Sequence, residues 1–176
     1  GGGLSNYMAY GDLPTNGYGD ISSFKFPRGV ILDRNLANVI PVDGKDPMQV
    51  QEYVKHSWYD YAGGNDVGLH PWDGVTEPNF VLGKGTKGSK TNIEQIDESA
   101  KYSWVKSPRY KGQPVEVGPL ARYVLGYAMG NPEFKEPVDM VLKKLDVPIQ
   151  ALFSTLGRTA ARGLEASWSA HKMKYF

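Results

Sequence analysis

The stretch "GPLARYVLGYAMG", residues 118–130, separates two kinds of local structure in this chain. Its proline stands at the expected first position of a helix, and the following Asn131-Pro132 marks a stop after Gly130. Apolar residues recur between these signals at helical spacing, at Leu120, Val124, Tyr127 and Ala128. The stretch therefore predicts one helix and the start of a helical region.

Two further helices are expected after it. Residues 133–146 place Phe134 and Val138 on one apolar face, and residues 148–171, beginning at Pro148, form the longest periodic segment. Glycine inside a helix costs about 1 kcal/mol relative to alanine and is usually tolerated where a neighbour comes close. Gly126, Gly157 and Gly163 therefore predict helices that pack tightly against other elements, some of them outside this segment.

The residues before the helical region are rich in turn signals. Short apolar runs at 29–32 and 37–42 predict strands on either side of a turn at 33–35, whereas residues 50–61 leave helix and strand open. The predicted class is α+β, with a loop and short-strand layer over 1–117 and a helical part over 118–176.

Composition excludes several kinds of function. The 176 residues carry a net charge of +1, which gives no argument for nucleic acid, and contain no cysteine. His56, His70 and His171 are not at close ligand spacing, so a self-contained metal site is not expected. There is no apolar run long enough for a membrane span and no signal-peptide pattern. The last helical pattern runs out without a cap, from which we expect a piece of a longer protein.

The segment "LGKGTKGSK", residues 82–90, has the glycine spacing of a dinucleotide-binding loop at Gly83, Gly85 and Gly88. No long apolar-striped helix follows it, and Gly88-Ser89-Lys90 reverses the order found in phosphate loops. A surface loop is predicted, with no nucleotide. Ser57 beside His56 is no nucleophile–base pair either, because adjacent side chains point apart.

Two segments are rich in both aromatic and charged residues: "GLHPWDGVTEPNF" at 68–80 and "KYSWVKSPRYKGQPVEVGPLAR" at 101–122. Ordered loops of aromatic and charged residues are where binding residues tend to lie. The alternative is structural: the aromatic rings fill a core, while Glu116 and Arg122 pair as buried ions. The residues alone leave both interpretations open.

These two segments, with others in the chain, resemble a known protein family. "HSWYDY", "GLHPWDGVTEPNF", "YSWVKSPRYKGQPVEVGPLAR" and "STLGRTAARGLEA" resemble the middle portion of the large subunit of membrane-associated, hydrogen-uptake nickel-iron hydrogenases. "YMAYGDLP" and "FPRGVI" extend the resemblance to nearly the whole chain, and four separate blocks in the right order make it specific.

The resemblance implies a parent enzyme that oxidises dihydrogen to protons and electrons. In that family a nickel-iron centre, with carbon monoxide and cyanide on the iron, is held by four cysteines in two Cys-x-x-Cys motifs near the family's termini. This segment has neither motif, so no catalytic, cofactor-binding or metal-ligating residue is assigned to it, and alone it should be inert. The family further implies an iron-sulfur small subunit as partner and a position on the periplasmic side of the cytoplasmic membrane.

The expected contribution of the segment is a scaffold. By resemblance, the helices after Gly118 belong to a larger bundle around the metal centre, and residues 1–117 form an outer layer of the same large domain. A buried charge network is predicted from Glu116, Arg122, Arg158 and Arg162, because guanidinium groups hold carboxylates rigidly. The competing hypothesis is a self-contained carbohydrate-binding module in which Trp58, Trp72, Trp104 and the tyrosines stack against sugar rings.

Overall fold

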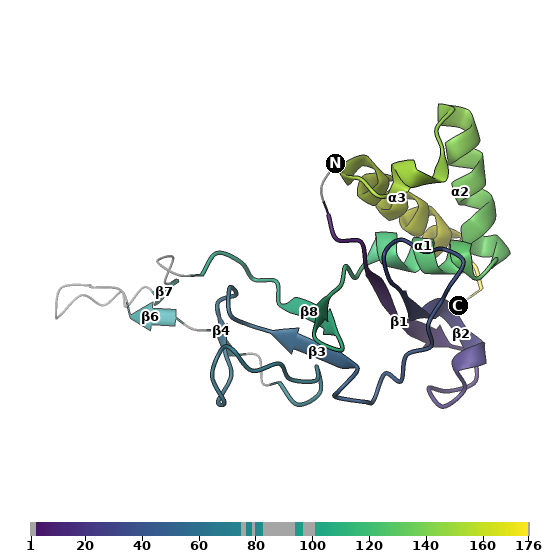
Figure 1. Cartoon of the computed structure of the whole chain (residues 1–176). Helices are drawn as coiled ribbons and strands as arrows, with labels where there is room; N and C mark the ends of the chain where they lie inside the picture. Colours follow the sequence, from purple (N-terminus) through teal and green to yellow (C-terminus); the bar gives the residue numbers. More distant parts are fainter. Residues whose placement is uncertain (1–2, 75–76, 79, 83–93, 97–100, 176) are drawn as a thin grey trace. The chain divides into compact units, whose positions relative to one another are not determined.

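The computed structural model describes residues 3–74, 77–78, 80–82, 94–96 and 101–175 (Figure 1). These residues form two compact units, one of Gly1–Val42 with Pro114–Phe176 and the other of Asp43–Gln113. The glycine-rich loop from Gly83 to Lys90, interpreted above as a surface loop, lies outside the described residues.

The first unit begins with a β-hairpin. Strand β1 (Tyr7–Pro14) pairs antiparallel with β2 (Phe24–Ile31), from Tyr7 opposite Ile31 to Pro14 opposite Phe24, with a short 3-10 turn η1 (Ile21–Ser23) between them. The strand predicted at 37–42 is wrong, since only an isolated bridge joins Ile40 to Val30. The partner of β2 comes from the stretch "YMAYGDLP", which local turn signals did not reveal.

Three helices complete this unit: α1 (Pro119–Ala128), α2 (Pro132–Leu145) and α3 (Thr155–Lys172). The first two agree with the predicted segments to within about two residues, the usual uncertainty of helix ends. The third begins seven residues later than expected at Pro148, because Ile149–Leu152 forms the 3-10 helix η2 instead. Extended Ser154 then caps α3, its hydroxyl accepting from the Gly157 N–H at 3.0 Å.

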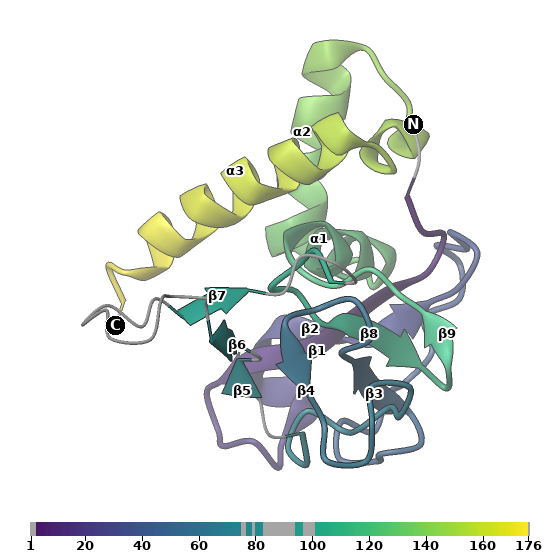
Figure 2. The same ribbon diagram turned by 90° about the vertical axis from the view of Figure 1, so that its left-hand side faces the viewer.

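Helix α1 is the centre of the first unit. It packs against both strands of the hairpin and against α2 and α3 (Figure 2). Its buried face supplies Leu120, Ala121, Tyr123, Val124 and Leu125, and the other elements add Tyr7, Ile31, Phe134, Val138, Leu152 and Ala161. Since α1 is covered on several sides, six of its ten residues are buried.

Phe134 of α2 packs tightly against Gly126 of α1, and alanine at this position should destabilise the protein. An added Cβ would lie 2.4 Å from Cγ of Phe134, which is fully buried and packed edge-on against Tyr123. Overpacking of this kind costs about 1–3 kcal/mol. Thermal unfolding of the full-length protein that contains this segment should show the loss in the Gly126→Ala variant. Combining it with Phe134→Leu should cost less than the sum of the two single changes, and strict additivity would argue against the clash.

The second unit is built from short strands. Strand β3 (Val50–Tyr53) pairs antiparallel with β8 (Ser107–Tyr110), which also pairs with β9 (Gln113–Pro114). Two more antiparallel pairs are β4 (Tyr59–Asp60) with β5 (Glu77–Pro78) and β6 (Phe80–Leu82) with β7 (Glu94–Ile96). The ambiguous region 50–61 therefore contains strand rather than helix.

The predicted α+β class is confirmed, with short strands in the first half and three α-helices in the second. None of the helices in the described ranges is both long enough and apolar enough to cross a membrane. The division at residue 118 within one larger domain stays a prediction.

Candidate functional site

The described residues do not fit a nickel-iron centre. The whole sequence lacks cysteine, the soft ligand that such a centre requires, and no three His, Asp or Glu side chains gather in metal-binding range among the described residues. Buried His70 is engaged otherwise: its Nδ1 accepts from the Trp72 N–H at 3.1 Å, and its Nε2 lies 2.8 Å from the Gly44 carbonyl oxygen.

The neighbouring His56 and Ser57 do not form a catalytic pair in the structure. Ser57 is buried, whereas His56 is exposed and its ring stacks on Tyr102 with centroids 5.5 Å apart. Their side chains thus lie in different environments, as expected for adjacent residues.

Glu116 and Arg158, both predicted from the sequence as members of a charge network, form a bidentate ion pair. Arg158 donates from Nε to Oε1 and from Nη2 to Oε2 of Glu116, both at 2.6 Å, and the side chains are 25% and 16% exposed. These hydrogen bonds raise the pKa of the Arg158 guanidinium above its ordinary value. Glu116 also bridges β1 through its backbone, donating to Asn6 O and accepting from Met8 N. One residue therefore joins β1, the segment before α1, and α3.

A second two-pronged pair joins α1 to α3. Arg122 donates from Nε and Nη2 to the two carboxylate oxygens of Glu165, at 2.7 and 2.5 Å. Its guanidinium also lies over the ring of Phe26 on β2, 5.1 Å from the centroid. Arg122 thus contacts three elements of the first unit.

Two details differ from what the residues suggested. The proposed Glu116–Arg122 pair is not formed, because each of these residues has a different partner. Arg162 is exposed, and the contact the structure gives it is a 3.3 Å hydrogen bond to the Arg158 carbonyl oxygen. Sequence reasoning left out Glu165, although it shares a polar helical stripe with Arg158 and Arg162. That these charges work as a structural network stays a prediction.

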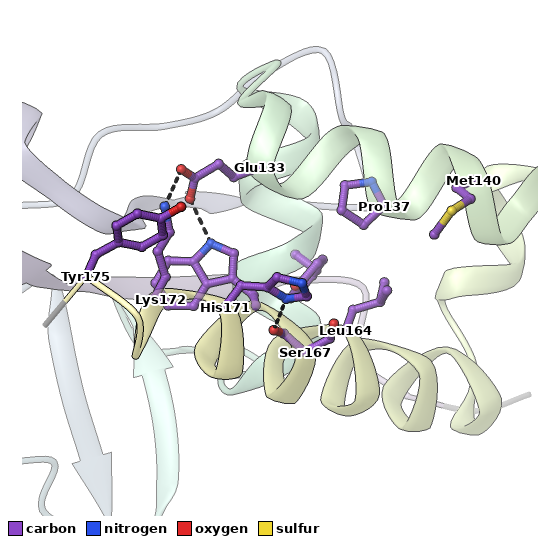
Figure 3. A pocket seen from close by; sticks show the side chains of 10 residues that line it. Glu133, Pro137, Met140, Leu164, Ser167, His171, Lys172 and Tyr175 are labelled. Carbon is purple, nitrogen blue, oxygen red and sulfur yellow. Dashed lines mark hydrogen bonds and ion pairs between the residues drawn. The ribbon is translucent and has the colours of Figure 1, made fainter.

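Helices α2 and α3 also flank a groove of about 420 Å³ (Figure 3). At its edge Glu133 accepts from Lys172 Nζ at 2.6 Å and from the Trp168 indole N–H at 2.7 Å. Tyr123 of α1 also lines this groove and is only 1% exposed. Burial, with the negative charges of Glu165 and Glu133 adding to it, raises the pKa of Tyr123 to about 12, so its hydroxyl is protonated at neutral pH.

The Glu133 contacts should make stability depend on pH. Burial raises the pKa of this carboxyl, but the hydrogen bonds from Lys172 and Trp168 outweigh it, so the net pKa is lowered. Its stabilising contribution is therefore complete above the ordinary glutamate pKa and is lost as pH falls through the lower folded-state value. In the full-length protein that contains this segment, Glu133→Gln should have a lower melting temperature than wild type at neutral pH, and the two melting temperatures should converge below about pH 4. A difference that stays constant with pH would contradict this.

Ion pairs and aromatic contacts also order the second unit. Lys106 donates to Glu52 at 2.7 Å, and Lys101 donates to Asp60 at 2.8 Å. The rings of Trp58 and Trp104 meet edge to face, with centroids 5.0 Å apart, while Trp72 packs edge-on against His70. Edge-to-face rings do not form the flat platform on which sugars stack, so this arrangement does not favour a carbohydrate site.

Comparison with known proteins gives the class. A family model described as nickel-dependent hydrogenase matches residues 1–176, the entire chain. The chain belongs to the nickel-dependent hydrogenase family. The resemblance seen in the four sequence blocks is therefore confirmed.

Individual proteins of this family are similar to the chain over most of its length. The uptake hydrogenase large subunit of Rhizobium leguminosarum bv. viciae is 60% identical over 180 residues, covering 100% of this chain and 30% of the relative. The hydrogenase-1 large chain of Escherichia coli (strain K12) is 44% identical over 171 residues, covering 96% and 28%. The crystal structure of the reduced, active nickel-iron-selenium hydrogenase from Desulfomicrobium baculatum matches with a TM-score of 0.58 and 32% identity, over 94% of this chain and 29% of that one. The chain spans about 30% of the length of these relatives.

Proposed function

We propose that these residues are a central scaffold segment of the large subunit of a nickel-iron hydrogenase that oxidises dihydrogen to protons and electrons. One observation carries the proposal: the full length of the chain aligns at 60% identity with an uptake hydrogenase large subunit. The nickel-iron centre, with carbon monoxide and cyanide on its iron, is held by cysteines that lie outside this segment. The helices of this segment join a larger helix bundle. Both parts of the segment, residues 1–117 and 118–176, belong to one large-subunit domain.

The proposed role of the segment is to hold its helices in fixed positions relative to one another. The pairs Arg158–Glu116 and Arg122–Glu165 tie α3 to the segment before α1 and to α1 itself. Two-pronged arginine–carboxylate contacts fix orientation as well as distance, so they suit a frame that must not shift around a metal centre. Glu116, Arg122 and Arg158 are accordingly proposed as parts of a structural charge network, with Arg162 as a peripheral member.

The family resemblance further implies a partner and a location, which we include in the proposal. The electrons leaving the metal centre pass to an iron-sulfur small subunit. The resulting heterodimer is attached to the periplasmic side of the cytoplasmic membrane.

Nickel analysis of the full-length protein that carries this segment tests the proposal. After maturation in a host that assembles nickel-iron centres, we expect stoichiometric nickel, dihydrogen-dependent reduction of a redox dye, and an iron-sulfur subunit that co-purifies. Nickel near zero, with no activity under these conditions, would exclude a hydrogenase.

The segment produced alone should behave as an incomplete fold. Large apolar side chains are exposed on α2 and α3: Leu156 is 81% exposed, Leu145 64% and Met140 62%. Patches of this kind usually mark surfaces that another element covers. We expect the isolated segment to bind a hydrophobic dye such as ANS and to melt without a cooperative transition. A sharp melt with no dye binding would contradict the expectation.

A further inference from the structure

The turn that follows β1 contains the dipeptide Asn16-Gly17, in which a side-chain amide stands next to an accessible backbone nitrogen. Both residues are exposed. Gly17 has a φ of +78°, and a Cβ placed on it would meet no described atom within 4 Å. Its N–H donates no hydrogen bond within the described part of the chain. Because glycine has no side chain, this nitrogen is open to the amide carbon of the preceding residue.

The other asparagines in the described ranges lack this combination. Each is followed by a residue whose side chain crowds the next nitrogen, or by proline, whose nitrogen carries no hydrogen. The residues that follow them are Tyr7, Leu36, Val39, Asp66 and Pro132. Asparagine is one of the chemically labile residues of proteins. Among the described residues, that lability is therefore expected first at Asn16.

Asn16 also belongs to a small polar network at the closed end of the β1–β2 hairpin. Its Nδ2 donates to Asp20 Oδ2 at 3.1 Å, and its backbone N–H donates to Ser23 Oγ at 3.2 Å. Asp20 caps η1, and hydrogen bonds from Ser22 and Asn16 hold the pKa of its carboxyl below the ordinary value, so it is charged at neutral pH. Both contacts of Asn16 are exposed. Water competes for such contacts, so the amide can turn back towards Gly17.

We propose that Asn16 is a deamidation site, converted without an enzyme into aspartate and isoaspartate, and that the product weakens this turn. The Gly17 nitrogen forms a bond to Cγ of Asn16, the Cγ–Nδ2 bond breaks, and Nδ2 leaves as ammonia with the proton from the Gly17 nitrogen. Water then opens the resulting succinimide: attack at Cγ gives aspartate, and attack at the backbone carbonyl carbon gives isoaspartate. Water is the one co-reactant, and no electron is transferred. The new carboxylate faces charged Asp20, where a hydrogen-bond donor stood before.

Ageing of the full-length protein that contains this segment tests the reaction. The nickel-loaded protein is kept in warm, mildly alkaline buffer, and its peptides are analysed by mass spectrometry that separates isoaspartate from aspartate. We expect deamidation to accumulate several-fold faster at Asn16 than at the exposed internal controls Asn35 and Asn38. Equal rates, or no product at Asn16, would overturn the proposal.

Gly17→Asn is the matched variant for this measurement. Asparagine tolerates the left-handed conformation of Gly17 but adds a Cβ beside the reacting nitrogen. The reaction at Asn16 should therefore become several-fold slower, while the rates at Asn35 and Asn38 stay the same. An unchanged rate at Asn16 would contradict the succinimide route. These readouts do not depend on nickel content or activity, so their failure is distinct from a failure of the proposed function.

A variant that imitates the product tests the structural consequence. Asn16→Asp replaces the donor to Asp20 by a like charge, so it should lower the melting temperature of the full-length protein at neutral pH. Asn38→Asp adds the same charge at an exposed asparagine without the contact to Asp20 and should leave the melting temperature unchanged. Equal melting temperatures for the two variants would overturn the proposed weakening of the turn.

Discussion

Gly157→Ala is expected to be the most damaging small substitution in this chain. A Cβ at this position would lie 1.9 Å from the Leu152 carbonyl oxygen and 2.5 Å from its carbon. The atoms in the way belong to the backbone of η2 and cannot rotate aside, so the start of α3 would have to move. That movement would also break the cap in which Ser154 accepts from the Gly157 N–H. Overpacking combined with loss of a cap should cost about 3 kcal/mol or more.

Gly163→Ala is the matched control for this prediction. Gly163 lies in the same helix, but a Cβ there meets no described atom within 4 Å. Alanine should therefore stabilise α3 by up to about 1 kcal/mol, which is the propensity difference alone. Thermal unfolding of the full-length protein compares the two variants directly. A wild-type melting temperature for Gly157→Ala would show that η2 relaxes freely, against the expectation.

Arg158→Met should cause the second large loss. Methionine keeps much of the apolar stem but removes the guanidinium, so the Glu116 carboxylate, 16% exposed, loses both of its side-chain donors. Removing one partner of a fully buried pair costs about 3–5 kcal/mol; with this partial exposure we expect about 2–3 kcal/mol. The same change loosens the junction of β1, the segment before α1, and α3.

Arg162→Met is the control on the same helix. Its guanidinium makes one long hydrogen bond to a backbone carbonyl and is exposed, so the change should stay within about 0.5 kcal/mol. Glu116→Gln combined with Arg158→Met should be less harmful than the sum of the single changes, because the double variant leaves no unpaired charge. Chemical or thermal unfolding of the four proteins measures this coupling. Equal losses for Arg158→Met and Arg162→Met would argue against the assigned role of Glu116.

Local signals predicted α1 and α2 well. Proline at the start of α1, the Gly130-Asn131-Pro132 stop after it and apolar residues at helical spacing in both helices all act within a few residues. The start of α3 was wrong because Pro148 and Ser154 are both acceptable beginnings of a helix. In the structure α3 starts after Ser154, because residues 149–152 form η2 and the Leu152 backbone packs against Gly157.

Contacts between residues far apart in the chain were harder to predict from the sequence. Residues 37–42 were predicted to be a strand, but β2 pairs with β1 and only Ile40 bridges to Val30, because strand formation depends on which segments meet rather than on local propensity. The charged positions Glu116, Arg122 and Arg158 could be selected from the sequence, but not their partners. Glu165 was left out because its distance to Arg122 depends on how α1 crosses α3.

The start of the helical region, the absence of cysteine ligands and the membership of a hydrogenase family can all be read from the amino-acid sequence. These properties depend on residue identity and on spacings within one or two turns. Only the tertiary structure distinguished Gly126 and Gly157, which are crowded, from Gly163, which is open, and paired each arginine with its glutamate. The physical reason is range: Arg122 and Glu165 are 43 residues apart in the chain, and only the packing of whole helices brings them within hydrogen-bond distance.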